Sequence, residues 1–360
     1  MTDLNTPLDF SRGPTMKNRF MLAPLTNCQS AADGTLSDEE YRWLTLRAQG
    51  GFGLTMTCAA HVQQVGQGFP GQLGVWSDQH IEGLTRLAAG IGAHNSISIV
   101  QLHHAGNRSP EALIGAQPVC PSDDPETGAR ALSVEEVVKV RDDFIAGAVR
   151  AEQAGFDGVE LHGAHGYLLC QFFSEELNKR DDEYGGSTEN RFRLLHEIIA
   201  GIRAQCSDNF MLGLRLSPER FGMRIGEIRE VAQDLMMSGN LEFLDMSLWD
   251  TFKPPVEDNF ADRTLIECFT ELQRGNTRLG VAGKLRNPAE VEAAIAQGAD
   301  WVMLGRAAIL QHDFPQRYAD NPEFEPVRTP VTRSYLKQEG LSDTFVEYMN
   351  NWKGFVADAS

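Results

Sequence analysis

The densest group of potentially reactive side chains is His162-Gly-Ala-His165-Gly-Tyr167, two imidazoles and a phenol within six residues. This group directly follows an apolar run, Phe156–His162, that is expected to form a strand. Two imidazoles at such a junction could hold a carbonyl oxygen while the phenol gives a proton to a nearby carbon. Structural hydrogen bonding remains an open alternative. A metal pair is a third, although no matching carboxylates or histidines follow the other expected strands.

An arginine is expected inside the protein. In the run Met211–Ser217, Leu212, Leu214 and Leu216 alternate with Gly213, Arg215 and Ser217. Alternate residues of a strand share a face, and we place the Arg215 face inside the fold. A cation there is costly without an anionic partner. The sequence therefore indicates either a buried ion pair or a bound anion or electron-rich ring beside Arg215.

Two later runs end in Gly283-Lys284 and Gly305-Arg306. Glycines leave backbone N–H groups accessible, and adjacent basic side chains suit a phosphate monoester. Either glycine on its own could simply occupy a turn. Together the two pairs favour a phosphate site.

Amide and hydroxyl groups follow two earlier runs. Gln101 closes the third apolar run, and Thr26 follows Pro24 at the end of the first. A buried Gln either braces a neighbouring loop or binds the edge of a heterocycle, and a threonine hydroxyl can donate to a cofactor atom. With the groups above, they describe a phosphate clamp, a cation near a ring and donors at the ring edges. That combination suits a flavin mononucleotide (FMN) with a carbonyl substrate stacked on it.

The elements that must position these residues alternate along the chain. Eight short, almost wholly apolar runs are typical of strands covered on both faces: Phe20–Pro24, Phe52–Ala59, Ser96–Leu102, Phe156–His162, Phe210–Ser217, Leu241–Ser247, Arg278–Gly283 and Trp301–Gly305. Helix signals lie between them: capping boxes at Ser37–Glu40 and Ser133–Glu136, an N-cap at Asn287-Pro288, and helix-ending glycines at Gly155, Gly239 and Gly298.

This alternation predicts an α/β fold, a single (β/α)8 TIM barrel whose active site lies at the carboxyl ends of its strands. We expect one domain over 1–360, with the barrel over about 18–312, an insertion at 106–132 after the third strand, and a C-terminal helical tail over about 313–360. A doubly wound sheet is the alternative. No G-x-G-x-x-G motif follows an early strand, which argues against it.

Composition narrows the function classes. The chain has 360 residues, with 32 Lys and Arg against 50 Asp and Glu, a net charge of −18 that argues against nucleic-acid partners and anionic membranes. No stretch approaches the ~18 consecutive apolar residues of a membrane helix, and the first residues lack a signal-peptide pattern. The six cysteines are scattered, with no metal or iron–sulfur spacing. We therefore expect a cytoplasmic protein with free thiols and no metal.

Several motifs together resemble one family. Leu22–Asn27, Val100–Gly106, Ala154–Leu169, Tyr184–Arg191 and Leu304–Arg306 are similar, in this order, to segments of the Old Yellow Enzyme family of FMN-dependent ene-reductases. The resemblance runs from about Pro7 to about His312. The block around His162 and the Tyr184-Gly-Gly-Ser-Thr-Glu-Asn-Arg191 stretch are its most specific parts.

The resemblance implies a TIM barrel with non-covalent FMN that NADH or NADPH reduces. An electron-poor alkene, conjugated to a carbonyl or nitro group, is then reduced in the same place. By analogy, His162 and His165 bind the substrate oxygen and Tyr167 protonates the α-carbon. The family pattern gives as FMN-binding residues Ala23, Pro24, Leu25, Thr26, Ala59, Gln101, Arg215, Gly283, Lys284, Gly305 and Arg306, the last four facing the phosphate.

The sequence departs from the family pattern at several positions. Thr26 matches the classical branch, whereas His165 replaces an asparagine found in many classical members. Cys28 stands where some relatives have a substrate-binding tyrosine, so we take it as a candidate substrate contact. Asn107 displaces the usual arginine to Arg108. Trp249, in the loop after the sixth run, either walls the substrate site or packs in the core.

Other readings remain open. The same barrel could use a different electron acceptor. A flavin-free lyase could instead use Lys284 as a Schiff-base nucleophile, although this leaves the His162–Tyr167 group unexplained. The segment Arg333–Phe355 could form a contact in a homo-oligomer or cap the barrel's own core.

Overall fold

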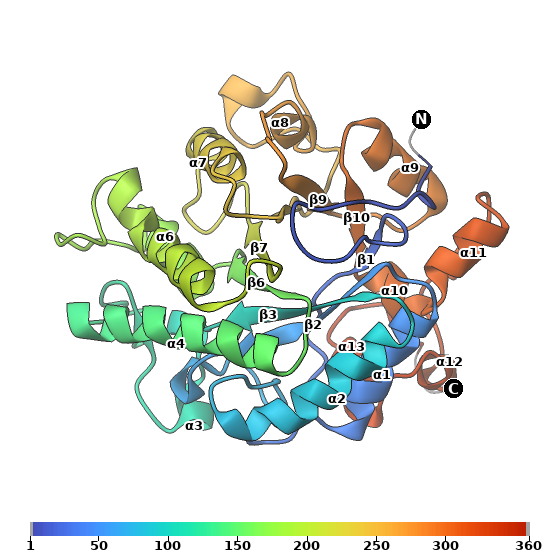
Figure 1. Ribbon diagram of the computed structural model, residues 1–360, viewed down its shortest axis with the longest axis horizontal. Helices are drawn as coiled ribbons and strands as arrows, with labels where there is room; N and C mark the ends of the chain where they lie inside the picture. Colours follow the sequence, from blue (N-terminus) through green and yellow to red (C-terminus); the bar gives the residue numbers. More distant parts are fainter. Residues whose placement is uncertain (1–2, 358–360) are drawn as a thin grey trace.

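The computed structural model describes residues 3–357, and its principal sheet is a closed barrel of parallel strands in the order β1-β10-β9-β8-β7-β6-β3-β2 (Figure 1). The barrel strands are β1 (Phe20–Leu22), β2 (Leu54–His61), β3 (Ile97–His103), β6 (Gly158–Gly163), β7 (Met211–Leu216), β8 (Phe243–Ser247), β9 (Arg278–Ala282) and β10 (Trp301–Leu304). Each lies within or closely overlaps one of the eight predicted runs. The predicted (β/α)8 TIM barrel is therefore confirmed.

Helices form the outer layer around the strands (Figure 1). Those that follow the barrel strands are α1 (Asp38–Gln49), α2 (Ile81–Gly92), α4 (Val134–Gln153), α6 (Thr188–Gln205), α7 (Ile225–Met237), α8 (Glu267–Thr270), α9 (Pro288–Ala296) and α10 (Arg306–Leu310). The remaining elements are η1 (Gln64–Gly66), η2 (Asp78–His80), α5 (Leu168–Phe173), η4 (Asp258–Phe260), α11 (Phe314–Asp320), α12 (Arg333–Gln338) and α13 (Asp343–Met349).

The predicted insertion after the third strand is present. It contains η3 (Gly106–Arg108), α3 (Glu111–Ile114) and two short paired strands, β4 (Val119–Cys120) and β5 (Arg130–Ala131). The tail also has the predicted short helices, although residues 358–360 of that tail lie outside the described part of the chain. Within residues 3–357, no helix combines the length and apolar character that crossing a bilayer requires.

Several helix boundaries follow local signals in the sequence. Ser133 and Glu136 form the reciprocal capping box, and the Asn287 side chain caps α9 with Pro288 in its first turn. The glycines predicted to end helices, Gly155, Gly239 and Gly298, all have positive φ.

The capping box predicted at Ser37 is only half formed. The Ser37 side chain accepts from the Glu40 backbone N–H at 3.0 Å. The Glu40 carboxylate does not return to the cap, because it is fully buried and accepts from Ser30 Oγ and, at 3.2 Å, from Asn27 Nδ2. The Glu40 carboxylate therefore binds side chains of the loop after β1 instead of the helix cap.

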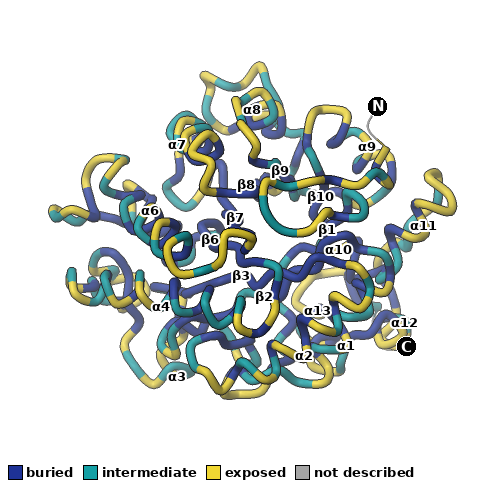
Figure 2. Tube along the Cα trace, in the orientation of Figure 1, coloured by how far each residue is buried: buried dark blue, intermediate teal, exposed yellow. Residues whose placement is uncertain are grey.

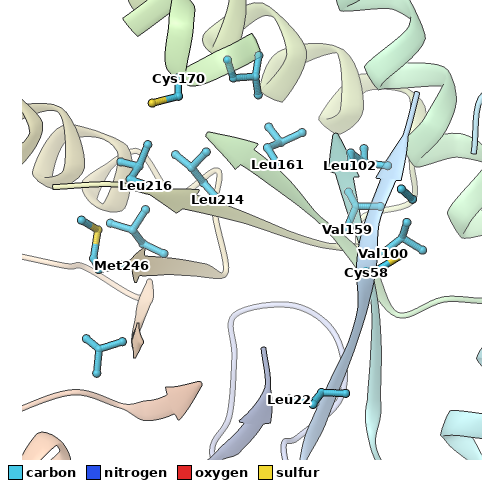
Figure 3. Close-up of a cluster of buried hydrophobic side chains, with 14 of the residues drawn as sticks. Leu22, Cys58, Val100, Leu102, Val159, Leu161, Cys170, Leu214, Leu216 and Met246 are labelled. Carbon is cyan, nitrogen blue, oxygen red and sulfur yellow. The ribbon is translucent and has the colours of Figure 1, made fainter. Parts of the chain in front are cut away.

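Strand alternation divides the core into two layers. Outward side chains such as Leu161, Leu214 and Leu216 pack in the layer between strands and helices (Figure 3). Inward side chains such as Met211, Phe243 and Trp301 form a separate apolar cluster at the amino-terminal end of the barrel interior. The strands are the most continuously buried part of the chain (Figure 2). The inward placement of Arg215, two residues after Gly213, is as predicted.

The N-terminal segment closes the bottom of the barrel. Leu8 and Met16 pair in an antiparallel bridge, and both belong to the inner cluster. The Phe10 ring meets Trp301 edge-on, with centroids 5.7 Å apart. The N-terminal segment and the inner cluster thus form an apolar plug at the bottom of the barrel. The polar inward side chains lie at the opposite, carboxyl-terminal end.

The C-terminal helix α13 packs on the barrel's own shell. Phe345 is fully buried and meets Trp43 of α1 edge-on, with centroids 4.9 Å apart. Val346 and Met349 are buried beside it. Of the two roles considered for this segment, capping the core is therefore observed.

Removing the Phe345 ring should loosen this cap. We expect Phe345→Ala to lower the free energy of unfolding by about 3–5 kcal/mol, because a fully buried aromatic side chain is lost and a cavity remains. Phe345→Leu is the matched control and should cost less than about 1.5 kcal/mol. Thermal melts of the three proteins measure this. Equal melting temperatures for the alanine variant and the parent would show that the Phe345 ring contributes no packing energy.

Candidate active site

A cavity of about 770 Å³ opens at the carboxyl ends of the barrel strands. Most residues predicted to bind cofactor or substrate line it. The predicted residues on its wall are Ala23, Pro24, Leu25, Thr26, His165, Tyr167, Arg215, Trp249, Gly283, Lys284, Gly305 and Arg306. Since they come from widely separated parts of the chain, barrel closure is what brings them together.

Four predicted site residues do not line this cavity. Gln101 and His162 are buried below its wall, with 1% and 5% of their surface exposed. Ala59 lies within β2, next to the irregular stretch in its pairing with β3, and faces Gln101 across the ladder. Cys28 is half-buried, and burial raises the pKa of its thiol to about 11. At neutral pH Cys28 is therefore a thiol with no negative charge.

The two histidines form a connected pair. Nε2 of His162 and Nδ1 of His165 are 3.0 Å apart, within hydrogen-bond distance. Burial holds the pKa of both imidazoles well below the usual range, and the charge of Arg215 lowers both further. Both rings are therefore neutral at neutral pH. Each neutral ring carries one N–H, and the bond between the rings uses one of the two, so a single N–H remains for a ligand.

Tyr167 lies against three imidazole and guanidinium groups. Its ring centroid is 4.4 Å from that of His103 and 5.1 Å from that of His162. The Arg108 guanidinium lies 4.5 Å from the centroid of the Tyr167 ring and donates to the His165 carbonyl at 2.7 Å. This packing fixes the phenol ring beside the histidine pair.

Arg215 lies beside polar groups on the two strands that flank it, β6 and β8. Its Nε donates to Ser247 Oγ at 2.7 Å, and Asp245 stands opposite it in the β7–β8 ladder. Glu160, on β6, accepts from Gln101 Nε2 at 2.6 Å. Ser247, Asp245, Glu160 and Gln101 are all buried. Both of the expected roles of Arg215 are thus compatible with its position: it has acidic neighbours below and the cavity above.

The opposite side of the cavity is cationic. Lys284 pairs with Asp250 at 2.7 Å. Among the described residues, neither Arg286 nor Arg306 has an ion-pair partner. Burial lowers the pKa of Arg306, and the nearby Arg286 charge lowers it further. Two adjacent uncompensated guanidiniums are the arrangement that a phosphate would stabilise.

Several cavity residues hold an uncommon backbone conformation. His165, Phe221, Trp249 and Lys284 have φ of 64°, 55°, 60° and 55°, the left-handed region that non-glycine residues seldom adopt. Such conformations cost energy and gather at binding sites, where the surrounding structure enforces them. Here all four lie in loops at the carboxyl ends of barrel strands.

Part of the cavity wall consists of residues that the sequence did not predict for the site. Arg286 lies two residues after Lys284, and its proximity to that basic residue was an available signal. Tyr348, Met349 and Trp352 reach the cavity from α13 and the turn after it. No local pattern places them there, because only the packing of α13 on the barrel does so.

A second hollow lacks the reactive side chains of this cavity. The hollow, of about 850 Å³, lies on the far side of Arg286 and Arg306, against the segment 322–329. It contains neither the histidine pair nor Tyr167. Within residues 3–357, no three His, Cys, Asp or Glu side chains are grouped so as to hold a metal ion.

The cavity fits FMN. The free guanidiniums of Arg286 and Arg306 suit a dianionic phosphate, and the backbone at Gly305 is open: an added Cβ would meet only Leu25, at 3.4 Å. Ala23, Pro24 and Leu25 offer an apolar wall for a flat ring, and Arg215 stands in the floor between them and the histidines. The chemistry of this donor set therefore matches a phosphate at one side and an electron-rich ring over the barrel axis.

Comparison with known proteins supports this assignment. The NADH:flavin oxidoreductase / NADH oxidase family model matches residues 3–324. The chain is 32% identical to the probable NADH-dependent flavin oxidoreductase YqiG of Bacillus subtilis, covering 97% of our chain and 96% of that protein. It is 35% identical to the NADH:fumarate oxidoreductase of Klebsiella pneumoniae over 89% of our chain. The chain spans only 36% of the length of that Klebsiella protein.

Solved structures agree. The Old Yellow Enzyme homologue from Zymomonas mobilis superposes with a TM-score of 0.81 at 26% identity, covering 96% of our chain and 99% of that one. Morphinone reductase in complex with tetrahydroNAD superposes with a TM-score of 0.79 at 25% identity, covering 96% and 97%. The chain therefore belongs to the NADH:flavin oxidoreductase / NADH oxidase family, the family of the Old Yellow Enzyme homologues.

Proposed function

We propose that this protein takes hydride from NADH or NADPH and reduces the C=C bond of alkenes conjugated to a carbonyl or nitro group. The observation that carries the proposal is the sharing of one cavity by two sets of groups. His165 and Tyr167 come from the β6 side, while Arg286 and Arg306 come from the β9–β10 side. In the barrel order these strands lie on opposite sides, so a cofactor and a substrate can stack between them.

In this proposal His165 supplies the hydrogen bond to the substrate oxygen. Its ring lines the cavity, whereas His162 lies behind it and is bonded to it. If His162 Nε2 donates to His165 Nδ1, the proton of His165 is on Nε2 and points away from its partner. His162 then sets the tautomer of His165. A neutral N–H aimed at the oxygen stabilises the negative charge that develops there during reduction.

Tyr167 would supply the proton to the α-carbon. Its phenol lies beside the histidine pair, so a substrate whose oxygen is held by His165 has its α-carbon within reach of this side of the cavity. A phenol is a suitable donor for this step, because it keeps its proton until a carbanion-like carbon forms. Trp249 and Trp352 would cover the site, and both are partly exposed at its mouth.

The remaining groups would hold the cofactor. Ala23, Pro24, Leu25 and Thr26 would contact the ring system, and Arg215 would face its electron-rich edge. Gly283, Lys284, Gly305 and Arg306, joined by Arg286, would hold the phosphate. When bound, FMN supplies a centre that accepts hydride from the nicotinamide and returns it to the alkene. Ala59 and Gln101 would support the ring from below, and Cys28 would lie at the margin of the substrate site.

Of the two alternatives, an observation on the structure argues against one. A different electron acceptor in the same cavity remains an alternative within the family. A Schiff-base lyase would need a free Lys284 amine, but this lysine is paired with Asp250. Borohydride trapping of a lysine adduct would favour the lyase.

The first test is an anaerobic visible spectrum. We expect the purified protein to show an oxidised flavin band that bleaches with NADPH or NADH and returns when 2-cyclohexenone is added. Bleaching without return would favour the different acceptor. A colourless protein that takes up no added FMN would exclude a flavin-dependent function altogether.

Tyr167→Phe tests the proton donor. We expect flavin reduction by NADPH to be unchanged and alkene reduction to slow by about 100-fold, the usual scale for losing a general acid. Stopped-flow measurement of the two half-reactions separates these effects. Tyr318→Phe is the control, because its hydroxyl bonds Glu292 outside the barrel, and it should leave both rates as they are. An unchanged alkene rate in Tyr167→Phe would remove this residue from the mechanism.

Arg215→Ala tests the cofactor floor. We expect the FMN dissociation constant to rise by about tenfold or more, since a buried charged donor is lost and its acidic neighbours lose their cation. Equilibrium dialysis or fluorescence titration of the apoprotein with FMN measures this constant. The opposite result, unchanged FMN affinity, would place the ring away from Arg215.

A further inference from the structure

Beneath Arg215 the barrel interior holds two acidic side chains that the proposed chemistry does not use. Glu160 projects from β6 and Asp245 from β8, and both have no exposed surface. They lie between the apolar plug at the bottom of the barrel and the cavity at its top. Arg215 is their only charged partner of opposite sign in this layer of the described structure.

Three of the four carboxyl oxygens of this pair lack a hydrogen-bond donor among the described residues. Glu160 Oε1 accepts from Gln101, but among the described residues Glu160 Oε2 and both oxygens of Asp245 have no partner. The Arg215 Nε proton goes to Ser247 instead. Three buried carboxylate oxygens without donors would be a severe desolvation penalty if both groups were ionised.

The absence of a side chain at Gly280 leaves room for the Asp245 carboxyl group. A Cβ added at Gly280 would lie 2.2 Å from Asp245 Oδ1 and 2.4 Å from the Trp301 indole nitrogen, which itself has no described hydrogen-bond partner. Only glycine at 280 admits the Asp245 carboxyl at this point. The surrounding groups on β3, β6, β9 and β10 are otherwise Gln101, His162, Gly280 and Trp301, none of which is charged.

Counting charges gives the protonation state. Two carboxylates and one guanidinium sum to a net charge of −1 in a region closed to solvent, whereas one added proton makes the sum zero. Burial raises the pKa of both carboxyl groups, the negative charge of Glu160 raises that of Asp245 further, and Arg215 opposes these shifts only in part. Both the net charge and the missing hydrogen-bond donors therefore favour protonation of one of the two carboxyl groups.

We propose that Glu160 and Asp245 share a single proton, and that the one remaining negative charge is the counter-charge of Arg215. The pair are positioning residues: they hold the guanidinium toward the cavity and fix how much positive charge it presents to the ring above. This inference rests on the proposed function for its effect on the flavin. The shared proton itself does not depend on it.

Isosteric amides test the proposal. In Glu160→Gln the remaining acid, Asp245, gives up the shared proton, and in Asp245→Asn Glu160 keeps the charge, so each single variant still has one carboxylate beside Arg215. We therefore expect both singles to keep the midpoint potential of the bound flavin close to the parent value. The double variant leaves Arg215 uncompensated, which stabilises the more negatively charged reduced flavin, so its potential should rise. Anaerobic equilibration with a reference dye measures all four proteins.

The pattern of the four potentials decides between charge states. Two ionised carboxylates in the parent would instead make each single variant raise the potential, with the double showing the sum of the two shifts. That additive outcome would overturn the shared proton. An unchanged potential in the double variant would overturn the counter-charge role of the pair.

A second measurement needs neither flavin nor substrate. A protonated carboxyl group has an infrared carbonyl stretch that ionised carboxylates lack, and at alkaline pH the exposed acids of this chain are ionised. Glu40 is also fully buried, and burial raises its pKa, so it can add to this region of the spectrum. We expect the apoprotein to show a band that is retained at mildly alkaline pH and lost in each single amide variant, in which Glu40 is unchanged. Absence of the band in the parent would overturn the proposal even if the double variant failed to fold. A protein that shows the band but binds no flavin would refute the proposed function and leave the shared proton standing.

Discussion

A guanidinium buried inside a barrel is the interaction on which the rest of this site depends. Arg215 stands on the inward face of β7 with 6% of its surface exposed. A cation there must be compensated, and the neighbouring strands supply Asp245, Glu160 and Ser247 for that purpose. Gly213 and Gly280 have no side chain, because Phe243 at the first position, and Asp245 and Trp301 at the second, occupy the space that a Cβ would need. One charge therefore constrains residue choice on several strands.

The cavity above has a charge opposite to that of the whole chain. With 50 acidic against 32 basic residues, the protein carries a net charge of −18, yet no Asp or Glu lies among the described residues on the cavity wall. The acidic groups closest to it pair with its cations from outside, as Asp250 does with Lys284, or lie below it, as Asp245 does. Field lines from the basic groups are thus concentrated in the cavity, which favours small anions such as phosphates over large polyanions.

The sequence predicted the fold well because barrel strands have a local signature. Runs buried on both faces are continuously apolar, and alternation assigned Arg215 to the interior without any tertiary information. Hydrogen-bond partners were predicted less well where a side chain can reach more than one partner. The Glu40 side chain was expected to accept from the backbone N–H at its helix cap. It instead accepts from the buried Ser30 hydroxyl, because a buried carboxylate needs a buried donor. Residues that reach the cavity from α13 could not be predicted, since their position depends on Phe345 packing against Trp43, a residue far earlier in the chain.

The histidine pair shows how burial limits what a motif can do. The sequence suggests two equivalent donors to one oxygen, and the spacing of His162 and His165 allows it. Burial and the charges of Arg215 and Arg108 keep His165 neutral, and burial and nearby positive groups do the same for His162. Two neutral rings bonded to each other offer one N–H, so only one ring can donate to a ligand. In the proposed function that donor is the ring on the wall, and the ring behind it determines which nitrogen carries the proton. A second donor to the oxygen would require the rings to part, and the Arg108 bond to the His165 carbonyl and the left-handed backbone at His165 both hold that residue in place.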